Sequence, residues 1–137
     1  MRVVIVGAGE VGSTIAESLA GTHEVVVVDI DSERVESLTY SHDVLPIEGD
    51  GSDVEVLEEA GVADADMLIA STDDDETNIV TCGAANVVSD AFTIARVKVP
   101  KYLSAWERAR SAFGVDFMVC TDLLTAEAIV GLAGLPT

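Results

Sequence analysis

The chain has 137 residues, of which 49% are hydrophobic, and its 25 acidic and 7 basic side chains give a net charge of -18. This length fits one domain with its own core, and no apolar run reaches the ~20 residues of a membrane-spanning helix. The charge disfavours nucleic acid and direct membrane insertion, and the first residues read as a strand rather than a signal peptide, which predicts a cytoplasmic protein.

The acidic residues are spread along the whole chain, whereas Lys98 and Lys101 are its two lysines. This composition resembles that of proteins from organisms that live in saturated salt, where the screening length falls to ~3 Å or less. The sequence therefore indicates an extreme halophile as its source, with an ordinary acidic protein as the alternative.

Short apolar runs alternate with amphipathic segments from one end of the chain to the other. The expected strands cover residues 2–6, 24–29, 44–48, 66–70, 92–97 and 116–120. The expected helices cover residues 10–20, 32–40, 53–60, 75–88, 101–112 and 122–132. This alternation predicts one α/β domain over residues 1–137, with a doubly wound (Rossmann-type) parallel six-stranded sheet of order 3-2-1-4-5-6.

Two helix starts carry capping signals. Ser52 with Glu55 three residues later forms a capping box for the third helix. Asp31 either caps the second helix or faces the edge of a bound ribose.

A glycine-rich segment follows the first strand and opens the first helix, and it reads Gly7-Ala8-Gly9-Glu10-Val11-Gly12. The first glycine permits the tight turn, the second lets the backbone approach a pyrophosphate, and the third allows close packing of the helix. Asp29 stands 20 residues after Gly9, at the end of the second strand. The helix N-terminus would hold phosphate and Asp29 the ribose hydroxyls, which disfavours a 2′-phosphate and hence NADP.

Two further loops follow strands at the edge of the sheet where open α/β folds bind ligands. The loop with Asp50 and Gly51 follows the third strand and should border the adenine. The loop with Ser71 and Thr72 follows the fourth strand and should flank the other end of the ligand. Asn78 lies early in the next helix, where it could face the same crevice. A plain turn is the alternative for the first loop, and a helix cap for the second.

With these features the chain resembles, over essentially all its length, the nucleotide-binding (RCK/KTN) N-terminal domain of TrkA-type potassium-transport regulators. The resemblance rests on the glycine segment and on several later motifs: His23-Glu24-Val25, Val28-Asp29-Ile30-Asp31, Gly49-Asp50, Ala60-Gly61, Ala65-Asp66, Ala70-Ser71-Thr72 with Asp74 and Asn78, Ile94-Ala95-Arg96-Val97 and Gly114-Val115-Asp116. The segment Val119-Cys120-Thr121-Asp122 departs from the serine-proline-glutamate turn of many relatives.

The resemblance implies a cytosolic regulatory subunit that binds NAD(H) or ATP/ADP and gates K⁺ flux through a membrane transporter or channel. It would lie at the inner face of the membrane through that partner and assemble as a homodimer or larger ring. The second ligand-binding domain common in the family is not expected within these 137 residues, which leaves open a piece of a longer protein or a single-domain member. The resemblance places Asp29 at the ribose and Ile30 among the cofactor-binding residues. It places Thr72 and Asn78 at the distal phosphate or nicotinamide, and Arg96 at a phosphate. A surface salt bridge is the alternative role for Arg96.

Residues able to support catalysis are sparse, although an NAD-dependent oxidoreductase is the alternative function. His23 and His42 precede strands, on the wrong side of the sheet for the crevice, and Tyr102 lacks the lysine of a Tyr-x-x-x-Lys pair. Cys82 and Cys120 belong to no ligand cluster, which predicts two small buried side chains and no metal site. We therefore expect no catalytic residue.

Two helices indicate assembly, because their apolar residues cover more than one face. They are the helix at 75–88 and the final helix, where Ile129 and Leu132 are expected to need a partner subunit to cover them.

Overall fold

The computed structural model describes residues 1–41, 43–120 and 124–133. They form a six-stranded sheet of order β3-β2-β1-β4-β5-β6, in which every neighbouring pair is parallel. The strands are β1 (Arg2–Val6), β2 (Glu24–Asp29), β3 (Leu45–Glu48), β4 (Met67–Ala70), β5 (Phe92–Val97) and β6 (Phe117–Cys120). The helices are α1 (Glu10–Ala20), α2 (Ser32–Ser41), α3 (Val54–Glu59), α4 (Asp75–Val88), α5 (Pro100–Arg108) and α6 (Leu124–Ala133), with short 3-10 turns η1 (Val62–Asp64) and η2 (Arg110–Ala112). The predicted fold class and strand order are confirmed.

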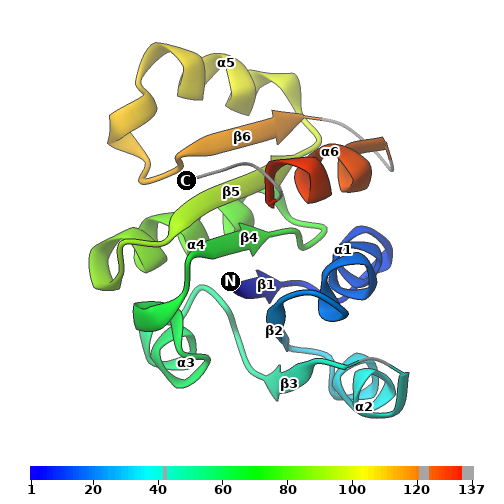
Figure 1. The fold of residues 1–137 in the computed structure, drawn as a ribbon. Helices are drawn as coiled ribbons and strands as arrows, with labels where there is room; N and C mark the ends of the chain where they lie inside the picture. The colour runs from blue at the N-terminus through cyan, green and yellow to red at the C-terminus, as the bar shows by residue number, and fades with distance from the viewer. Residues whose placement is uncertain (42, 121–123, 134–137) are drawn as a thin grey trace.

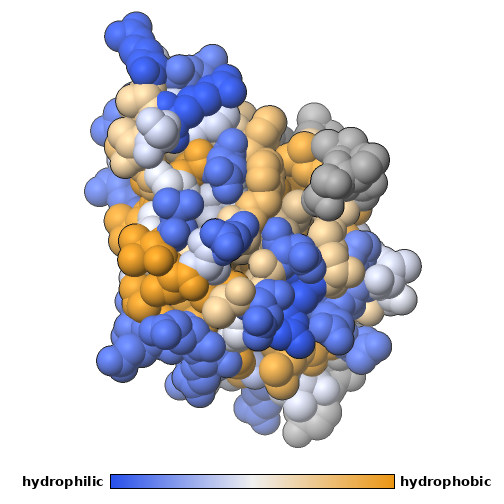
Figure 2. Space-filling view, turned by 60° about the vertical axis from the view of Figure 1, so that its left-hand side comes forward, coloured by the Kyte–Doolittle hydropathy of each residue, from blue (hydrophilic) through white to orange (hydrophobic). Residues whose placement is uncertain are grey.

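The helices cover the sheet in two layers. Figure 1 shows α1, α2 and α6 on one face and α3, α4 and α5 on the other. The alternation of side chains along β1 explains this arrangement, because Val4 and Val6 pack among side chains of α3, α4 and α5, whereas Val3 and Ile5 pack among those of α1, α2 and α6. Both faces of the central strands are therefore buried, as their continuous apolar runs predict. The face in Figure 2 carries hydrophilic side chains at its top and bottom, with apolar side chains gathered between them.

Two predicted elements differ in detail. The helix expected at 101–112 ends at Arg108, and η2 follows it, because Ala109 leaves the helical conformation with φ -146° and ψ 56°. The capping box at Ser52 was wrong. Asp53 caps α3 by accepting a hydrogen bond from the Glu55 N–H at 2.9 Å, while the Ser52 hydroxyl is engaged with Asp50 at 2.7 Å.

One face of the final helix packs against the rest of the subunit. Ile129 is fully buried and packs with residues of α1 and the sheet, so the expectation that only a partner covers it was wrong. Cys82 is buried, as expected, whereas Cys120 is only half-buried, and both thiols are free. The departure at Thr121-Asp122 and the position of His42 lie outside the described residues. Within the part of the chain that is described, no helix is long and apolar enough to cross a membrane.

Candidate functional site

The turn between β1 and α1 requires glycine at two of its positions. Gly7 has φ +107°, and a Cβ there would lie 2.7 Å from the Ser71 carbonyl oxygen. A Cβ at Gly12 would overlap the Gly7 carbonyl. Gly9 is the N-cap of α1 with φ -73° and provides no side chain to cap the helix. The first N–H groups of α1 can therefore serve a bound anion, which the helix dipole also favours.

Asp29 at the end of β2 is tied into the glycine turn. Its Oδ2 accepts a hydrogen bond from the Ala8 N–H at 2.6 Å, and its Oδ1 accepts one from the Asp31 N–H at 2.8 Å. Asp29 is only 7% exposed, yet it lines the cavity beside Ile30. Asp31 in turn accepts a hydrogen bond from the Glu33 N–H at 2.9 Å, so it caps α2.

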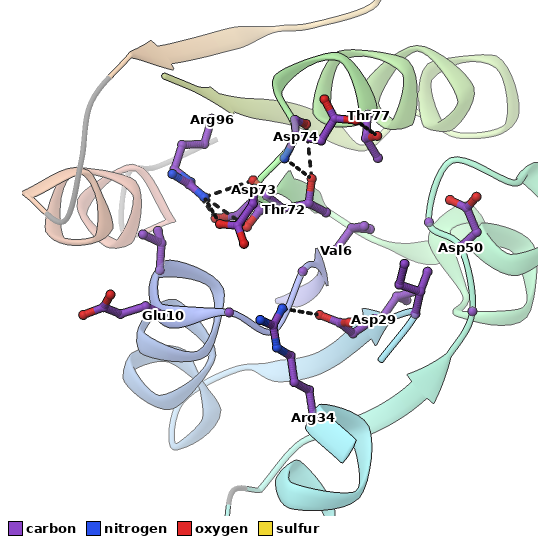
Figure 3. Close-up of a pocket in the computed structure, with 18 of the residues that line it drawn as sticks. Val6, Glu10, Asp29, Arg34, Asp50, Thr72, Asp73, Asp74, Thr77 and Arg96 are labelled. Atoms are coloured by element: carbon purple, nitrogen blue, oxygen red, sulfur yellow. Dashed lines mark hydrogen bonds and ion pairs between the residues drawn. The ribbon is translucent and has the colours of Figure 1, made fainter. Parts of the chain in front are cut away.

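Arg34 enters the same site from the first turn of α2, and the sequence analysis missed it. Its guanidinium lies 3.8 Å from Oδ2 of Asp29 and 3.8 Å from Oδ2 of Asp31, and its side chain is 47% exposed (Figure 3). The three-residue spacing from Asp31 was the available signal, because residues i and i+3 share a helix face.

The loop after β3 places Asp50 on the opposite wall of the cavity. One carboxylate oxygen of Asp50 accepts hydrogen bonds from the Ser52 hydroxyl at 2.7 Å and from the Ser52 N–H at 2.9 Å. These two bonds, the hydroxyl's first, lower the pKa of Asp50. Gly51 is buried against Val6, whose side chain would overlap a Cβ at this position.

Arg96 at the end of β5 is buried and reaches the loop that follows β4. Its Nε donates to the Ser71 hydroxyl at 3.1 Å, and its Nη2 donates to the Thr72 carbonyl at 3.0 Å. The nearest carboxylate is Asp73, 3.9 Å from Nη2 and largely exposed. Arg96 is therefore a buried cation at the cavity wall rather than a partner in a surface salt bridge, and its one ion pair with a described residue is long.

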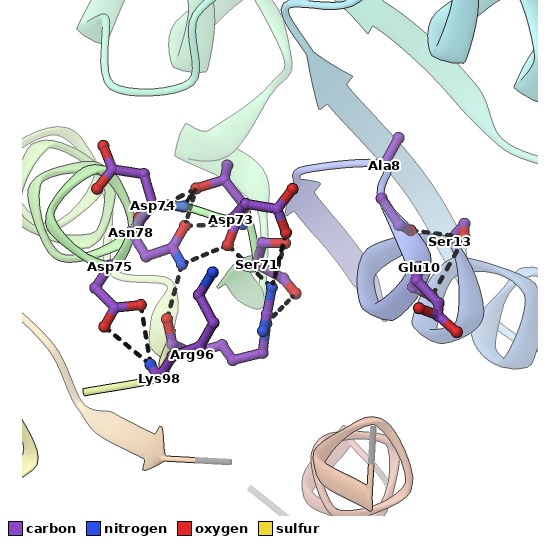
Figure 4. Close-up of polar contacts among 12 residues, drawn as sticks. Ala8, Glu10, Ser13, Ser71, Asp73, Asp74, Asp75, Asn78, Arg96 and Lys98 are labelled. Atoms are coloured by element: carbon purple, nitrogen blue, oxygen red, sulfur yellow. Dashed lines mark hydrogen bonds and ion pairs between the residues drawn. The ribbon is translucent and has the colours of Figure 1, made fainter. Parts of the chain in front are cut away.

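Asn78 does not face the cavity, so its predicted contact with the ligand was wrong. The side chain is 0% exposed and uses both ends of its amide within the protein. Oδ1 accepts from the Thr72 N–H at 2.8 Å and from the Thr72 hydroxyl at 2.6 Å. Nδ2 donates to the carbonyls of Thr72 at 3.0 Å and Arg96 at 2.7 Å (Figure 4). The first turn of α4 faces the sheet here, and Asn78 joins the loop after β4 to the end of β5.

Lys98 is a second cavity residue that the sequence analysis missed. Both carboxylate oxygens of the buried Asp75 accept the Lys98 N–H at 2.9 Å, and Oδ2 also accepts the Val99 N–H at 2.9 Å. Asp75 thus fixes the start of the β5–α5 loop against α4, and the Lys98 side chain lines the cavity.

These loops enclose a cavity of about 770 Å³ at the carboxyl edge of the sheet. Most of the predicted site residues line it: Gly7, Gly9, Glu10, Val11, Asp29, Ile30, Asp50, Gly51, Ser71, Thr72 and Arg96. Ala8, Gly12 and Asn78 lie behind this wall and support it. The cavity is also lined by residues outside the predicted site: Val6, Val28, Arg34, Gly49, Asp73, Asp74, Thr77 and Lys98. Its volume is that of a small-molecule site.

His23, which the sequence analysis considered for catalysis, lies outside this cavity. His23 precedes β2 and so lies at the amino edge of the sheet, opposite the cavity. Across the described residues no group of three or more His, Cys, Asp or Glu side chains could hold a metal ion.

Comparison with known proteins places this geometry in a family. The TrkA-N domain model matches residues 3–121. The Trk system potassium uptake protein trkA homolog 1 of Methanosarcina mazei is 39% identical over 144 aligned positions, which cover 100% of this chain and 35% of that protein. The Trk system potassium uptake protein TrkA of Vibrio alginolyticus is 36% identical over 140 positions, covering 99% and 31%. The chain thus spans about a third of the length of these relatives.

Among solved structures, the GsuK RCK domain is 26% identical with a TM-score of 0.73, and the match covers 86% of this chain and 25% of that one. The GsuK channel bound to NAD is also 26% identical, with a TM-score of 0.73, and the match covers 86% of this chain and 21% of that one. GsuK bound to ADP is 26% identical with a TM-score of 0.74, and the match covers 87% of this chain and 31% of that one. Because the family model covers most of the chain and the relatives match throughout it, the chain belongs to the TrkA-N domain family.

Proposed function

We propose that this domain binds an adenine nucleotide, NAD(H) or ATP/ADP, and regulates potassium transport. In this proposal it acts in the cytoplasm, at the inner face of the membrane, as a homo-oligomer attached to a membrane transporter or channel. Nucleotide binding changes its shape and thereby gates K⁺ flux, with no chemical conversion of the ligand.

The observation that carries the proposal is the placement of the positive charges. The chain has seven basic side chains and a net charge of -18, yet Arg34, Arg96 and Lys98 all line this one cavity. Together with the uncapped start of α1, they provide a site for an anion in a protein that otherwise repels anions. A nucleotide with two or more phosphates fits both the charge and the volume.

The arrangement of the lining supports a role for each predicted residue. The glycine turn and α1 would hold the phosphates, Asp29 the ribose, and Asp50 with Gly51 the adenine edge. Ser71, Thr72 and Arg96 would meet the far end of the ligand. GsuK, which has been solved with NAD and with ADP, shares this fold, which supports the same ligand classes here.

The potassium-transport role is supported by the relatives. The Methanosarcina mazei and Vibrio alginolyticus relatives are Trk system potassium uptake proteins, and the match runs through the whole of this chain. An oxidoreductase needs a proton-transfer group beside the nicotinamide. The described lining contains no histidine, tyrosine or cysteine, and its ionisable side chains are carboxylates, Arg34, Arg96 and Lys98. This composition favours a binding module over an enzyme.

Matched glycine variants test nucleotide binding. Gly9→Ala places a methyl group where the phosphates would approach; the backbone φ of -73° allows it, and the nearest heavy atom is 3.6 Å away. Gly21→Ala makes the same change at the other end of α1, with φ -76° and no atom within 4 Å. Calorimetric titration with NADH, NAD, ATP and ADP in multimolar KCl should show binding to the wild type and to Gly21→Ala. The affinity of Gly9→Ala should be lower than that of the wild type by about tenfold or more. Equal affinity in both variants contradicts the phosphate assignment.

The ribose assignment has its own test. NADP(H) should bind markedly more weakly than NAD(H), because its 2′-phosphate approaches the buried carboxylate of Asp29. Equal affinity for NAD and NADP would contradict the assignment of the ribose to Asp29.

Catalysis and transport are tested separately. The domain with NADH and common carbonyl substrates should show no turnover above background, and turnover that Gly9→Ala abolishes would favour the oxidoreductase. For transport, K⁺ uptake by cells that express the full-length protein should respond to Gly9→Ala and not to Gly21→Ala.

A further inference from the structure

Arg34 is a positive charge at a place where its own helix does not favour one. It is the third residue of α2, and a cation in the first turn of a helix opposes the helix dipole. It is also one of only seven basic side chains in a chain with a net charge of -18. The helix dipole therefore gives no reason for an arginine here, whereas the cavity that Arg34 lines offers one.

The Arg34 guanidinium lies where the end of β2 meets the glycine turn. Its Nη1 is 3.8 Å from Oδ2 of Asp29, the oxygen that also accepts the Ala8 N–H. A Cβ added to Gly9 would lie 3.6 Å from the same Nη1. The guanidinium is thus at the junction of the residue assigned to the ribose hydroxyls and the turn assigned to the phosphates (Figure 3).

The two carboxylates beside Arg34 hold it only loosely. Its Nε is 3.8 Å from Oδ2 of Asp31, which equals the separation of Nη1 from Asp29. Both separations exceed the length of a hydrogen bond, about 2.7–3.2 Å. The side chain is also 47% exposed. Within the described part of the chain its ion pairs are therefore long ones, and its planar array of N–H donors can still bind an anion in the cavity.

The other two basic residues of the lining are too far away to take this role. Arg96 is at the end of β5 and donates to the loop after β4, and Lys98 follows β5. Three strand spacings separate β2 from β5 in the sheet, a distance of about 14 Å. Figure 3 accordingly shows Arg34 and Arg96 on opposite sides of the cavity.

The charges around Asp29 bear on the 2′ position of a bound ribose. Asp29 and Asp31 are two carboxylates and Arg34 is one cation, so the group is negative overall. A free 2′-hydroxyl carries no charge and can donate a hydrogen bond to Asp29. A 2′-phosphate would instead bring a charge of about -1.5 to -2 against the same carboxylate, with Arg34 as its one nearby cation.

We propose that Asp29 and Arg34 act in opposite directions at the 2′ position of the adenosine ribose and together set the selectivity of the site. Asp29 favours a free 2′-hydroxyl and repels a 2′-phosphate. Arg34 is the group that binds a 2′-phosphate once the carboxylate charge is removed. This inference rests on the proposed function, because it takes an adenine nucleotide as the ligand, and it adds a specificity-determining residue to the site.

A double-mutant cycle at positions 29 and 34 tests the proposal. The four proteins are the wild type, Arg34→Gln, Asp29→Asn and the double variant, each titrated by calorimetry with NAD and NADP. In about 1 M KCl the screening length is about 3 Å, so that only charges in contact contribute. The quantity compared is the Kd for NADP divided by the Kd for NAD. A purely structural effect weakens both ligands and leaves this ratio unchanged.

Each protein of the cycle has its own expected ratio. In the wild type NADP should bind at least about tenfold more weakly than NAD. Arg34→Gln should raise the ratio by about tenfold, because a charge-assisted hydrogen bond to the phosphate is lost. Asp29→Asn should lower the ratio by about tenfold or more, because the repulsion is removed. The double variant should lie about tenfold above Asp29→Asn, since Arg34 supplies the phosphate contact there.

Control variants and a second ligand pair narrow the interpretation. Arg108→Gln removes the same charge from an exposed residue of α5 outside the cavity lining and should not change the ratio. Arg34→Lys keeps the charge without the planar donors and should lie between the wild type and Arg34→Gln. ADP and its 2′-phosphorylated derivative repeat the comparison without a nicotinamide.

Folding of the variants is checked by circular dichroism melting. Arg34→Gln is itself sufficient to test the proposal if Asp29→Asn does not fold. Arg34 is half-exposed, and its replacement leaves in place the two hydrogen bonds that Asp29 accepts from Ala8 and Asp31.

Three results would overturn the proposal: a ratio that Arg34→Gln leaves unchanged, a ratio that Asp29→Asn leaves unchanged, or an Asp29→Asn ratio that is the same with and without Arg34. In each case nucleotide binding itself persists, so the proposed function stands. A wild type that binds neither NAD nor ADP would instead overturn the proposed function and this inference with it.

Discussion

The carboxylate of Asp29 accepts the N–H of Ala8 at 2.6 Å, so the acidic residue at the end of β2 holds the glycine turn that follows β1. Its second oxygen holds the Asp31 N–H that leads into α2. One side chain therefore fixes two loops of the cavity before any ligand arrives. A residue expected to serve the ribose also has a structural role, which bears on how its variants should be interpreted.

Asp29→Asn should lower stability as well as affinity. An amide offers one acceptor oxygen in place of two, so either the Ala8 N–H or the Asp31 N–H loses its partner and faces an NH₂ group. A buried, unsatisfied donor costs about 1–3 kcal/mol. Urea unfolding should show a lower midpoint at an unchanged slope. Asp90→Asn, at an exposed position, is the matched control, and equal midpoints for the two variants would contradict the bracing role.

Asn78→Ala should destabilise the protein, because Asn78 joins the loop after β4 to the end of β5. The variant leaves the Thr72 N–H and the Arg96 carbonyl without their side-chain partner, which should reduce the free energy of unfolding by about 1–3 kcal/mol. Asn86→Ala removes the same amide from an exposed position of the same helix and should change it by less than about 0.5 kcal/mol. Similar losses in both variants would show that Asn78 is not a special brace.

The strands, the glycine turn and most of the cavity lining could be predicted because they depend on local pattern. Apolar runs such as 25–28 are typical of buried parallel strands. The spacing of Gly7, Gly9 and Gly12 after a strand is typical of a turn that leads into a helix. The side-chain directions could not be predicted. Asn78 lies near the cavity but faces the sheet, because the phase of α4 is set by its packing. Arg34 on α2 and Lys98 after β5 line the same cavity only because the fold brings these distant parts of the sequence together. The packing of Ile129 against α1 likewise depends on the fold.

Acid should weaken the loop that Asp50 forms with Ser52. The pKa of Asp50 is lowered by hydrogen bonds that exist only in the folded state, first from the Ser52 hydroxyl and then from the Ser52 N–H. A lowered folded pKa contributes stability above the unfolded pKa of about 3.9, and this contribution is lost as the pH falls through the folded value. Between about pH 5 and pH 2 the wild type should therefore lose more stability than Asp50→Asn, as measured by urea midpoints. Parallel acid limbs for the two proteins would contradict this contribution.

Low salt should destabilise the fold. The net charge is -18. The acidic side chains are closer together in the folded chain than in the unfolded chain, and therefore repel one another more strongly when folded. Raising KCl from about 0.15 M to 1 M shortens the screening length from about 8 Å to about 3 Å, which weakens this repulsion. The melting temperature should therefore rise steeply with KCl.

A charge variant separates this repulsion from the general stabilisation that salt gives through hydrophobic burial. Glu17→Lys with Glu36→Lys makes the chain less negative at exposed positions, so its melting temperature should be higher than that of the wild type at low salt and should rise less with KCl. The two proteins should converge in multimolar KCl, where the charges are screened. A wild-type melting temperature that does not change with KCl would remove the argument for a halophilic protein, and equal slopes for both proteins would assign the salt effect to burial rather than charge.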